Sequence, residues 1–407
     1  MYHVQPITGD VYWIGVNDFV TNRFENIIPI PNGVSYNSYF IDDEKTAVVD
    51  TVDALVMEDF LDNVEYLLHG RHLDYIIVNH MEPDHSSSLL TLAERYPEAK
   101  IAGSAQALRM FEQFFHRPMK DRYVVIGEKV TLPLGRHTLR FFAAPMVHWP
   151  EVTFTYDETD HILFSADAFG CFGALQGSAF ADDADYRKDY EDEARRYYTC
   201  IVSKYGQQVL AAMKKVADLP IRYIAPLHGP VFREEKDRAL ILQQTARWAR
   251  WEPEVRSAAI FYTSVYGNTA SAAQTLAWKL RARGVAPVKV VDLCKTDAAF
   301  AMADVMKYSH LIFASTTYNM GLYPVMRYFL AMAGEHLVKG RKVALMGNSS
   351  WAPNIAGKVM KEMVSTWKDC TLLGEPVHIL SAPGPKEDAA MDALADIIAG
   401  DIQQAER

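Results

Sequence analysis

The chain has 407 residues, of which 49% are hydrophobic and 23% charged, and this length exceeds that of a usual single domain, so two or three domains are expected. With 51 acidic against 41 basic residues its net charge is −10, which argues against a nucleic-acid partner, and its four cysteines lack the CxxC spacing of a zinc ribbon or a rubredoxin-type site. No run approaches the roughly 18 apolar residues of a transmembrane helix, and the sequence starts without the basic and apolar stretches of a secretory signal, so we expect a cytoplasmic protein with no membrane partner.

The first 250 or so residues alternate short β-rich runs with polar turns. A hairpin is predicted over residues 36–51, where YNSYFI and TAVVDT flank the polar DDEK turn. Helical composition is found at 182–215 and 237–251. Four apolar runs predict strands, each ending at a residue that can bind a metal ion: 73–79, 138–147, 161–166 and 221–227.

The pattern changes to regular βα repeats near Glu252 and Pro253, because a helix does not easily continue into a proline. We therefore predict one domain over residues 1–252 and a second over 253–407. Helical patterns such as ASAAQTLAWKLRARG separate the strands of the second domain, which predicts a doubly wound, five-stranded parallel sheet. Its expected strands lie at about 257–263, 287–293, 309–315, 341–347 and 375–380.

A cluster of metal-ligand residues follows the strand at 73–79. His80, Glu82 and Asp84 stand at alternate positions, and His85 follows directly. In an extended segment this spacing places the first three side chains on one side, so that one loop can serve two adjacent cations. His85 either joins them or points away and leaves its place to water. The next segment, SSSLLTLAERY, predicts a serine-capped helix.

The other three predicted strands end at His148, Asp167 and His228. Any one of these residues alone is more simply explained as a cap or a turn residue. Together with the cluster they indicate a site for two metal ions, because loops at strand ends can converge in a layered α/β fold. The candidate ligands are His80, Glu82, Asp84, His85, His148, Asp167 and His228.

This cluster resembles the HxHxDH loop of the metallo-β-lactamase superfamily, with Glu82 in place of the second histidine. The substitution moves the site from zinc-favouring nitrogen ligands towards mixed nitrogen and oxygen ligands suited to iron. The sequence is therefore similar to the flavodiiron branch, which implies an αββα metallo-β-lactamase-like fold for the first domain. The implied ligands are His80, Glu82 and His148 for one iron, Asp84, His228 and either His85 or water for the other, and Asp167 as the bridging carboxylate.

The resemblance also implies a role for Tyr197, in the segment ARRYYTC. It corresponds to a tyrosine near the metal pocket that hydrogen-bonds a bound diatomic molecule. The alternative is that Tyr197 simply packs its helix against the core.

Three segments of the second domain predict a flavin site. TSVYGNT follows the first strand and opens a helix, so its amides and hydroxyls can hold one phosphate. It resembles the FMN phosphate loop of flavodoxins and is neither a Walker loop nor a GxGxxG turn. Two further segments follow the third and fourth strands, and Trp351 is the candidate to stack on the flavin. The alternative for each segment is an ordinary polar turn. The candidate FMN residues are Thr263, Ser264, Tyr266, Gly267, Asn268, Thr269, Ser315, Thr316, Thr317, Tyr318, Asn319, Gly321, Ser349, Ser350 and Trp351.

One departure from the family concerns the segment NSSWAPNIAGK, which lacks the glycine-rich stretch that many members carry around the tryptophan. This puts in question the detailed flavin contacts and the flavin potential. The prediction of FMN binding is not affected.

Taken as a whole, the resemblance implies an enzyme that reduces O₂ to water or NO to N₂O at two iron ions, with electrons passed through FMN. No rubredoxin or NAD(P)H:flavin reductase module follows in the sequence, so an external donor is expected, either rubredoxin or a reduced deazaflavin. A head-to-tail homodimer or a dimer of dimers is implied. The alternatives are a zinc hydrolase and a flavin electron carrier with a structural metal site.

Overall fold

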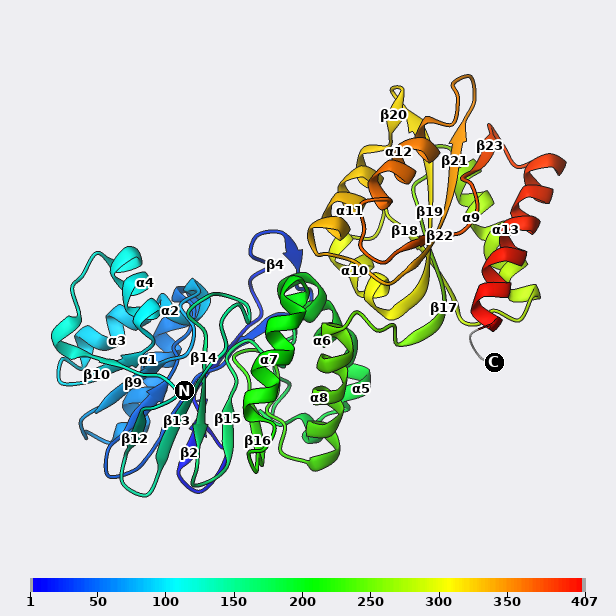
Figure 1. Cartoon of the computed structure of the whole chain (residues 1–407). Helices are drawn as coiled ribbons and strands as arrows, with labels where there is room; N and C mark the ends of the chain where they lie inside the picture. Colours follow the sequence, from blue (N-terminus) through cyan, green and yellow to red (C-terminus); the bar gives the residue numbers. More distant parts are fainter. Residues whose placement is uncertain (1–2, 405–407) are drawn as a thin grey trace. The chain divides into compact units, whose positions relative to one another are not determined.

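The computed structural model describes residues 3–404. The chain divides into two compact units, the first ending at Ala249 and the second beginning at Arg250 (Figure 1). The boundary expected from the sequence lies three residues later.

The first unit contains two sheets that pack face to face. One sheet has the order β1 (Gln5–Pro6), β2 (Val11–Trp13), β7 (Tyr39–Ile41), β8 (Ala47–Val49), β9 (Tyr75–Val78), β10 (Lys100–Gly103) and β11 (Tyr123–Val125). The other has the order β12 (Thr131–Pro133), β13 (Thr138–Ala143), β14 (Thr153–Asp157), β15 (Ile162–Phe164) and β16 (Tyr223–Ala225). Two short ribbons pair β3 (Val16–Asp18) with β6 (Val34–Tyr36) and β4 (Arg23–Phe24) with β5 (Ile28–Pro29).

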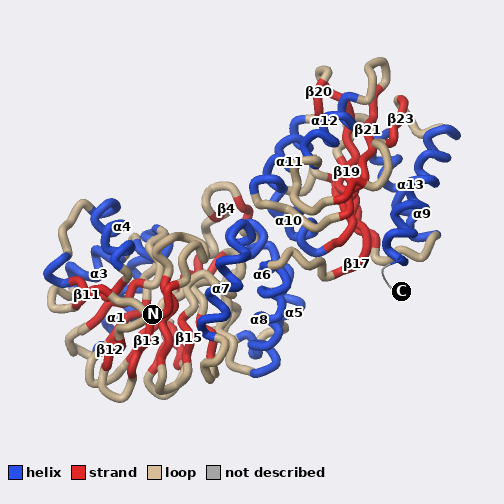
Figure 2. The backbone as a smooth tube through the Cα atoms, in the orientation of Figure 1, coloured by secondary structure: helices blue, strands red, loops and turns tan. Residues whose placement is uncertain are grey.

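Helices cover both outer faces of this sandwich, so the strands form the middle layers (Figure 2). On one side lie α1 (Met57–Leu68), α2 (Pro83–Ser86), α3 (Leu89–Arg95) and α4 (Ala105–Phe115). On the other lie α5 (Tyr186–Asp189), α6 (Glu191–Tyr197), a π-helix (Tyr198–Val202), α7 (Gly206–Val216) and α8 (Glu235–Ala249). The predicted αββα architecture is confirmed.

The core between the two sheets follows from the apolar runs of the sequence. Val49 and Ile77 of the first sheet and Phe141 and Phe164 of the second belong to one buried cluster. The hairpin predicted over 36–51 is confirmed, because β7 and β8 pair antiparallel from Tyr39↔Val49 to Ile41↔Ala47. Burial of such side chains, at roughly 25 cal/mol per Å², is the main force that holds the sheets together.

The strand predicted at 138–147 is wrong in its second half. β13 ends at Ala143 and residues 144–152 form a loop, closed by the hydrogen bond from Ala144 N to Val152 O at 2.9 Å. Pro145 has no N–H to donate and therefore interrupts the ladder. His148 consequently lies on a loop, five residues beyond the strand.

The second unit is a doubly wound sheet in the order β18 (Val288–Asp292), β17 (Val255–Tyr262), β19 (Tyr308–Tyr318), β21 (Lys342–Ser349) and β22 (Thr371–Leu372). β23 (Val377–Leu380) pairs with the second half of β21, and β20 (Gly321–Leu322) folds back antiparallel onto β19. The five predicted strands all form and are parallel. The two-residue strands β20 and β22 are additional.

Helices lie on both faces of this sheet. α9 (Asn268–Ala282) and α13 (Pro385–Gln404) pack on each other and on one face. α10 (Ala298–Lys307), α11 (Pro324–Glu335) and α12 (Ile355–Val364) cover the other (Figure 1). The predicted flavodoxin-like fold is confirmed.

Candidate metal and flavin sites

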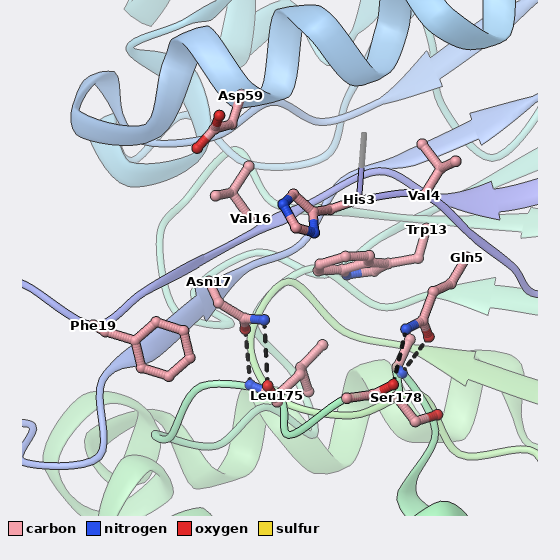
Figure 3. Close-up of a pocket in the computed structure, with 12 residues that line it drawn as sticks. His3, Val4, Gln5, Trp13, Val16, Asn17, Phe19, Asp59, Leu175 and Ser178 are labelled. Carbon is pink, nitrogen blue, oxygen red and sulfur yellow. Dashed lines mark hydrogen bonds between the residues drawn. The ribbon is translucent and has the colours of Figure 1, made fainter. Parts of the chain in front are cut away.

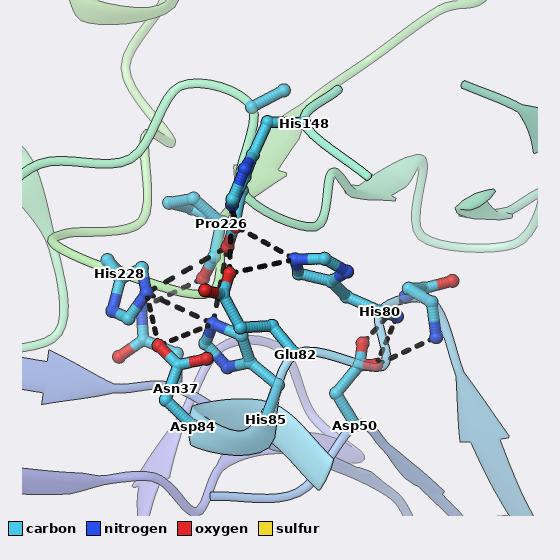
Figure 4. Close-up of polar contacts among 12 residues, drawn as sticks. Asn37, Asp50, His80, Glu82, Asp84, His85, His148, Pro226 and His228 are labelled. Carbon is cyan, nitrogen blue, oxygen red and sulfur yellow. Dashed lines mark hydrogen bonds and ion pairs between the residues drawn. The ribbon is translucent and has the colours of Figure 1, made fainter. Parts of the chain in front are cut away.

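The predicted metal ligands follow β9, β13, β15 and β16 in the chain and come together in space, and Figure 4 labels all of them except Asp167. Glu82 has an extended backbone (φ −58°, ψ 141°), as expected. Asp84 and His85 do not, because Pro83 begins the short helix α2, which contains both. The prediction of one extended run from His80 to Asp84 is therefore wrong.

The serine cap predicted for the following helix is also wrong. Ser88 occupies the N-cap position of α3 but makes no capping hydrogen bond. Its hydroxyl donates to the carbonyl of Val52 instead, at 2.8 Å.

Four side chains form a first group of candidate ligands. Glu82 Oε2 lies 3.3 Å from His80 Nε2 and 2.9 Å from His148 Nε2. Asp167 Oδ2 lies 3.2 Å from His80 Nε2 and 3.1 Å from His148 Nε2. Neighbouring donors about 3.2 Å apart can surround a common centre at about 2.0 Å, which is the usual distance from a metal ion to nitrogen and oxygen ligands.

A second group lies beside the first and shares Asp167 with it. His85 Nε2 is 3.0 Å from His228 Nε2, 3.3 Å from Asp84 Oδ2 and 3.2 Å from Asp167 Oδ1. Asp84 Oδ2 is also 3.2 Å from His228 Nε2. The two oxygens of Asp167 therefore face different groups, as a bridging carboxylate requires. The His85 ring points into the group.

The polar atoms of this cluster are suited to a cation. Among residues 3–404, His80 Nε2 and the carboxylate oxygens of Asp84 and Asp167 are buried and have no hydrogen-bond partner. Buried polar atoms without partners are costly, so their convergence at ion-pair distances indicates a shared positive ion. Nitrogen and carboxylate ligands in roughly equal number fit iron, so the donor set fits a diiron centre.

The sequence analysis missed the hydrogen bonds that orient two of the histidines. Glu151 Oε1 accepts from His80 Nδ1 at 2.7 Å and from Met81 N at 2.8 Å. The carbonyl of Ser35 accepts from His228 Nδ1 at 2.8 Å. Both contacts fix the tautomer that leaves Nε2 free for a metal ion. A glutamate 71 positions from His80 has no local signal in the sequence.

The charges of the cluster act strongly on each other. Burial alone would lower the pKa of His148, but the adjacent carboxylates of Asp167 and Glu82 raise the pKa to about 9. Burial would raise the pKa of Asp167, but His80, His148 and His85 hold it well below its usual range. The cluster is therefore an ion-paired set of groups, in which a metal ion would compete with protons on the imidazoles.

Tyr197 ends α6 on the same side as the metal cluster. Its ring centroid lies 5.5 Å from that of His228, and its hydroxyl is buried without a hydrogen-bond partner among residues 3–404. Burial and the charges of Asp167, Asp84 and Glu82 raise its pKa well above the usual value, so the phenol keeps its proton.

The candidate flavin residues gather at the carboxyl edge of β17, β19 and β21. The hydroxyls of Thr263 and Ser315 lie 2.8 Å apart, and Thr316 pairs with Asn348 across the sheet. The strand order changes direction between β17 and β19, and ligands of doubly wound sheets bind at such a switch point.

The first segment is suited to a phosphate. Gly267 (φ 93°) precedes α9, a 15-residue helix whose first N–H groups have no side-chain cap. Ser264 Oγ accepts from Gly267 N at 3.1 Å and so holds the turn. A helix N-terminus of this kind binds anions through its free N–H groups.

The other two segments are longer strands than predicted. β19 continues to Tyr318, where Asn319 and Met320 (φ 47° and 56°) form a tight turn into β20. β21 continues to Ser349, which pairs with Leu380 of β23.

Large aromatic side chains stand exposed around this edge. Tyr266 is 93% exposed, Trp351 85% and Tyr318 46%. Exposed aromatic groups gathered at one place are typical of a ligand site. They suit a flat ring such as that of a flavin.

A separate pocket of about 540 Å³ lies between the first three strands and the segment 175–179 (Figure 3). Asn17 exchanges two hydrogen bonds with the backbone of Leu175, and Gln5 binds the backbone of Gly177 and Ala179. These amides are engaged in holding the segment. The pocket brings none of the predicted site residues together.

Comparison with known proteins agrees with this architecture. The family model of the ODP family beta lactamase matches residues 34–229, and that of flavodoxin matches residues 260–368. The anaerobic nitric oxide reductase flavorubredoxin of Vibrio vulnificus is 31% identical over 355 residues, which cover 85% of this chain and 70% of that protein.

Two solved structures share the fold over almost the whole chain. The rubredoxin oxygen:oxidoreductase of Desulfovibrio gigas is 26% identical, with a TM-score of 0.92 and coverage of 99% of both chains. The flavodiiron protein of Giardia intestinalis is 24% identical, with a TM-score of 0.89 and coverage of 100% of this chain and 98% of that one. At the latter identity the likeness shows the fold alone.

The two units and their sites define an oxidoreductase that combines a metallo-β-lactamase-like domain with a flavodoxin-like domain. The chain belongs to the flavodiiron protein family. Its cofactors are FMN and a non-haem diiron centre. Within residues 3–404, none of the helices has the length and apolar character needed to cross a bilayer.

Proposed function

We propose that this protein reduces O₂ to water, NO to N₂O, or both, at the site formed by the two ligand groups, with electrons supplied through FMN. The observation that carries the proposal is the shared carboxylate: Asp167 presents one oxygen to each group, at 3.1 to 3.2 Å from the nearest imidazole nitrogens. A carboxylate-bridged iron pair supplies the redox chemistry for reducing a bound diatomic molecule, and FMN stores two electrons and passes them singly.

The ligand assignment follows the two groups. His80, Glu82 and His148 would hold one iron, Asp84, His85 and His228 would hold the other, and the Asp167 carboxylate would serve both. The orientation of His85, whose Nε2 faces three other donor atoms within 3.3 Å, supports its inclusion.

Tyr197 is the residue that we propose to meet the substrate. Its unpartnered, protonated hydroxyl is a hydrogen-bond donor on the same side as His228. Such a donor can orient a bound diatomic molecule and hold a proton near it. Tyr197→Phe should lower the turnover rate while the iron content stays that of the wild type.

In the second domain, the amides that follow Gly267 hold the FMN phosphate, and Trp351 stacks on the flavin ring. The remaining candidates, from Ser315 to Gly321 and from Ser349 to Ser350, meet the polar edge of the ring. Rubredoxin or a reduced deazaflavin would deliver the electrons.

The first experiment is anaerobic metal and flavin analysis of the purified protein, followed by addition of O₂ or NO to the photoreduced sample. Two irons and one FMN per chain, with rapid flavin reoxidation and water or N₂O as product, are expected. The two reoxidation rates rank the gases. Bound zinc with hydrolysis that persists without electrons would instead support a metallo-β-lactamase-type hydrolase, and flavin that reoxidises no faster than free FMN would support an electron carrier.

We also propose a head-to-tail dimer, in which the FMN of one subunit serves the iron pair of its partner. Two inactive variants test this: Asp167→Ala, expected to lose iron, and Gly267→Asp, which places a carboxylate in the phosphate loop. A side chain at Gly267 would meet nothing within 4 Å, but its φ of 93° strains any L residue, so thermal unfolding is measured to show that this variant is folded. Coexpressed as tagged heterodimers, the two should regain activity. Heterodimers that stay inactive although each variant keeps its other cofactor would contradict the arrangement.

A further inference from the structure

A small cavity of about 10 Å³ lies beside Asp167, where the loop after β15 meets α6, the π-helix, α7 and α8. A water molecule needs roughly 10 to 15 Å³ of such free space, so the cavity has the size of one water. Its lining includes the carboxylate residue Asp167 from the loop and the side chains of Tyr197, Tyr198 and Thr245 from the helices. The polar groups of these four residues decide whether the space can hold water.

These polar groups can supply the hydrogen bonds that a buried water requires, which number about three and range from two to four. The hydroxyls of Tyr197 and Tyr198 are buried and form no hydrogen bond with a protein group in the part of the chain that the structure describes. Thr245 of α8 is 2% exposed and adds a third hydroxyl. Each oxygen of the Asp167 carboxylate has a second lone pair besides the one that faces a ligand group.

The two tyrosine hydroxyls need a partner. Burial raises the pKa of Tyr198, and burial together with the charge of Asp167 raises that of Tyr197, so each phenol keeps a proton to donate. A buried donor left unpaired costs the desolvation penalty of the group. Val202 and Val209, which also line the cavity, offer no acceptor in their side chains. A water molecule in the cavity would satisfy the hydroxyls.

An irregular turn of helix lies beside the cavity. Tyr197 ends α6, and Tyr198 begins the π-helix that runs to Val202. In a regular α-helix, with 3.6 residues per turn, consecutive side chains point about 100° apart. Here both tyrosines line the same small space. Turns of π-helix are frequent at functional sites, which agrees with a specific role for this pair.

We propose that the cavity binds one ordered water molecule, which connects the carboxylate of Asp167 with the hydroxyls of Tyr197 and Tyr198. An ionised carboxylate only accepts hydrogen bonds, so the water donates one hydrogen to Asp167 and accepts one from Tyr198. Its second hydrogen meets the hydroxyl oxygen of Tyr197. The O–H of Tyr197 then stays free to donate on the side of His228, whose ring centroid lies 5.5 Å from that of the tyrosine.

The role of this water rests on the proposed function, since the donor that it orients is the hydroxyl assigned to the bound diatomic molecule. A hydrogen bond accepted by the Tyr197 oxygen polarises its O–H and strengthens the bond that this O–H donates. Tyr198 is therefore a positioning residue that acts on Tyr197 through the water. The water site itself depends only on the cavity and its lining.

Matched variants test the site. Tyr198→Phe removes the hydroxyl that donates to the water and keeps the ring, whose centroid lies 5.5 Å from that of Trp248. Thr245→Val removes another hydroxyl of the lining with little change of shape. Tyr186→Phe is the control, because Tyr186 is also a buried tyrosine whose hydroxyl has no protein partner among residues 3–404, but it does not line the cavity. Thermal unfolding shows whether each variant is folded.

The readouts are the electron density of the cavity in high-resolution crystals of the holoenzyme, kcat and KM for each gas, and the infrared N–O stretch of NO bound to the reduced protein. The wild type and Tyr186→Phe should show one ordered water, and Tyr198→Phe and Thr245→Val should show lower occupancy. The kcat of Tyr198→Phe should fall about 2- to 10-fold at an unchanged KM, the change that corresponds to one neutral hydrogen bond. Its N–O stretch should move in the direction found for Tyr197→Phe, whereas that of Tyr186→Phe should not move.

Two results would overturn the inference. A cavity without density, in a wild-type crystal that shows other buried waters, would exclude the water site. Equal kcat values and equal N–O stretches in Tyr198→Phe and Tyr186→Phe would exclude its role in positioning Tyr197. The density does not depend on turnover, so an ordered water in a protein without reductase activity would refute the proposed function and leave the water site in place.

Discussion

Glu151 provides the sharpest test of how this fold prepares its metal site. Its side chain is fully buried and accepts hydrogen bonds from His80 Nδ1 and from Met81 N, at 2.7 and 2.8 Å. Glu151→Ala removes the oxygen that accepts both hydrogen bonds, so the His80 ring can turn and its Nε2 no longer stays aimed at Glu82 and Asp167. Loss of such an orienting partner typically costs about 10- to 100-fold in metal affinity, or about 1.4 to 2.7 kcal/mol.

The assay is iron retention against a chromogenic Fe(II) chelator under anaerobic conditions, with FMN content measured in the same sample. Glu151→Ala should lose one iron per chain about 10- to 100-fold more readily than the wild type. Glu151→Gln keeps an acceptor oxygen and should lose less. Glu158→Ala is the control, because Glu158 is exposed and pairs with Arg140 at the surface.

FMN content should not change in any of these variants, because the flavin segments belong to the other domain. A Glu151→Ala protein that keeps both irons as firmly as the Glu158→Ala control would refute the argument. It would mean that His80 is held by its metal ion and the surrounding packing alone.

Three further changes test other parts of the molecule. Trp351→Ala should raise the dissociation constant of FMN about tenfold, the equivalent of about 1.4 kcal/mol of ring stacking, without altering the iron content. An unchanged FMN affinity in equilibrium titration would exclude Trp351 as the stacking group. Arg341→Met should destabilise the flavodoxin-like unit by about 3 to 5 kcal/mol in thermal unfolding, because the buried guanidinium donates to four backbone carbonyls. Arg281 is exposed, so Arg281→Met should have no such effect. Equal losses of stability in the two variants would contradict the reasoning. Burial lowers the pKa of His137, but the hydrogen bond to Asp157 outweighs burial and raises the pKa. The contribution of His137 to stability is therefore full below its ordinary pKa of about 6.5 and is lost as the pH rises through the raised value. The melting temperature of the wild type should fall more over this pH range than that of His137→Asn, and an equal fall would refute the argument.

The sequence alone determined the two-domain architecture and the kinds of ligand available. Continuous apolar runs such as YIIV mark buried strands whatever their neighbours, because burial on both faces leaves no place for polar residues. The change to βα repeats after Pro253 indicated the second domain. Glu82, standing between His80 and Asp84, indicated a mixed nitrogen and oxygen donor set before any geometry was known.

Where strands end was decided by tertiary pairing. β21 extends to Ser349 because β23, about 30 residues further along the chain, supplies partners for its last residues. Hydrogen-bond partners so far apart in the chain leave no mark in the local pattern of residues.

The division of the ligands into two groups that share Asp167 was likewise decided only by the tertiary structure. Asp84 and His85 are adjacent in the chain, but the direction of each side chain depends on helix α2, which a local pattern of alternate residues did not reveal. Glu151 meets His80, and Ser35 of the ribbon strand β6 meets His228, only because segments distant in the chain pack together. The types of ligand are a property of single residues, whereas their distances and orientations are a property of the packed fold.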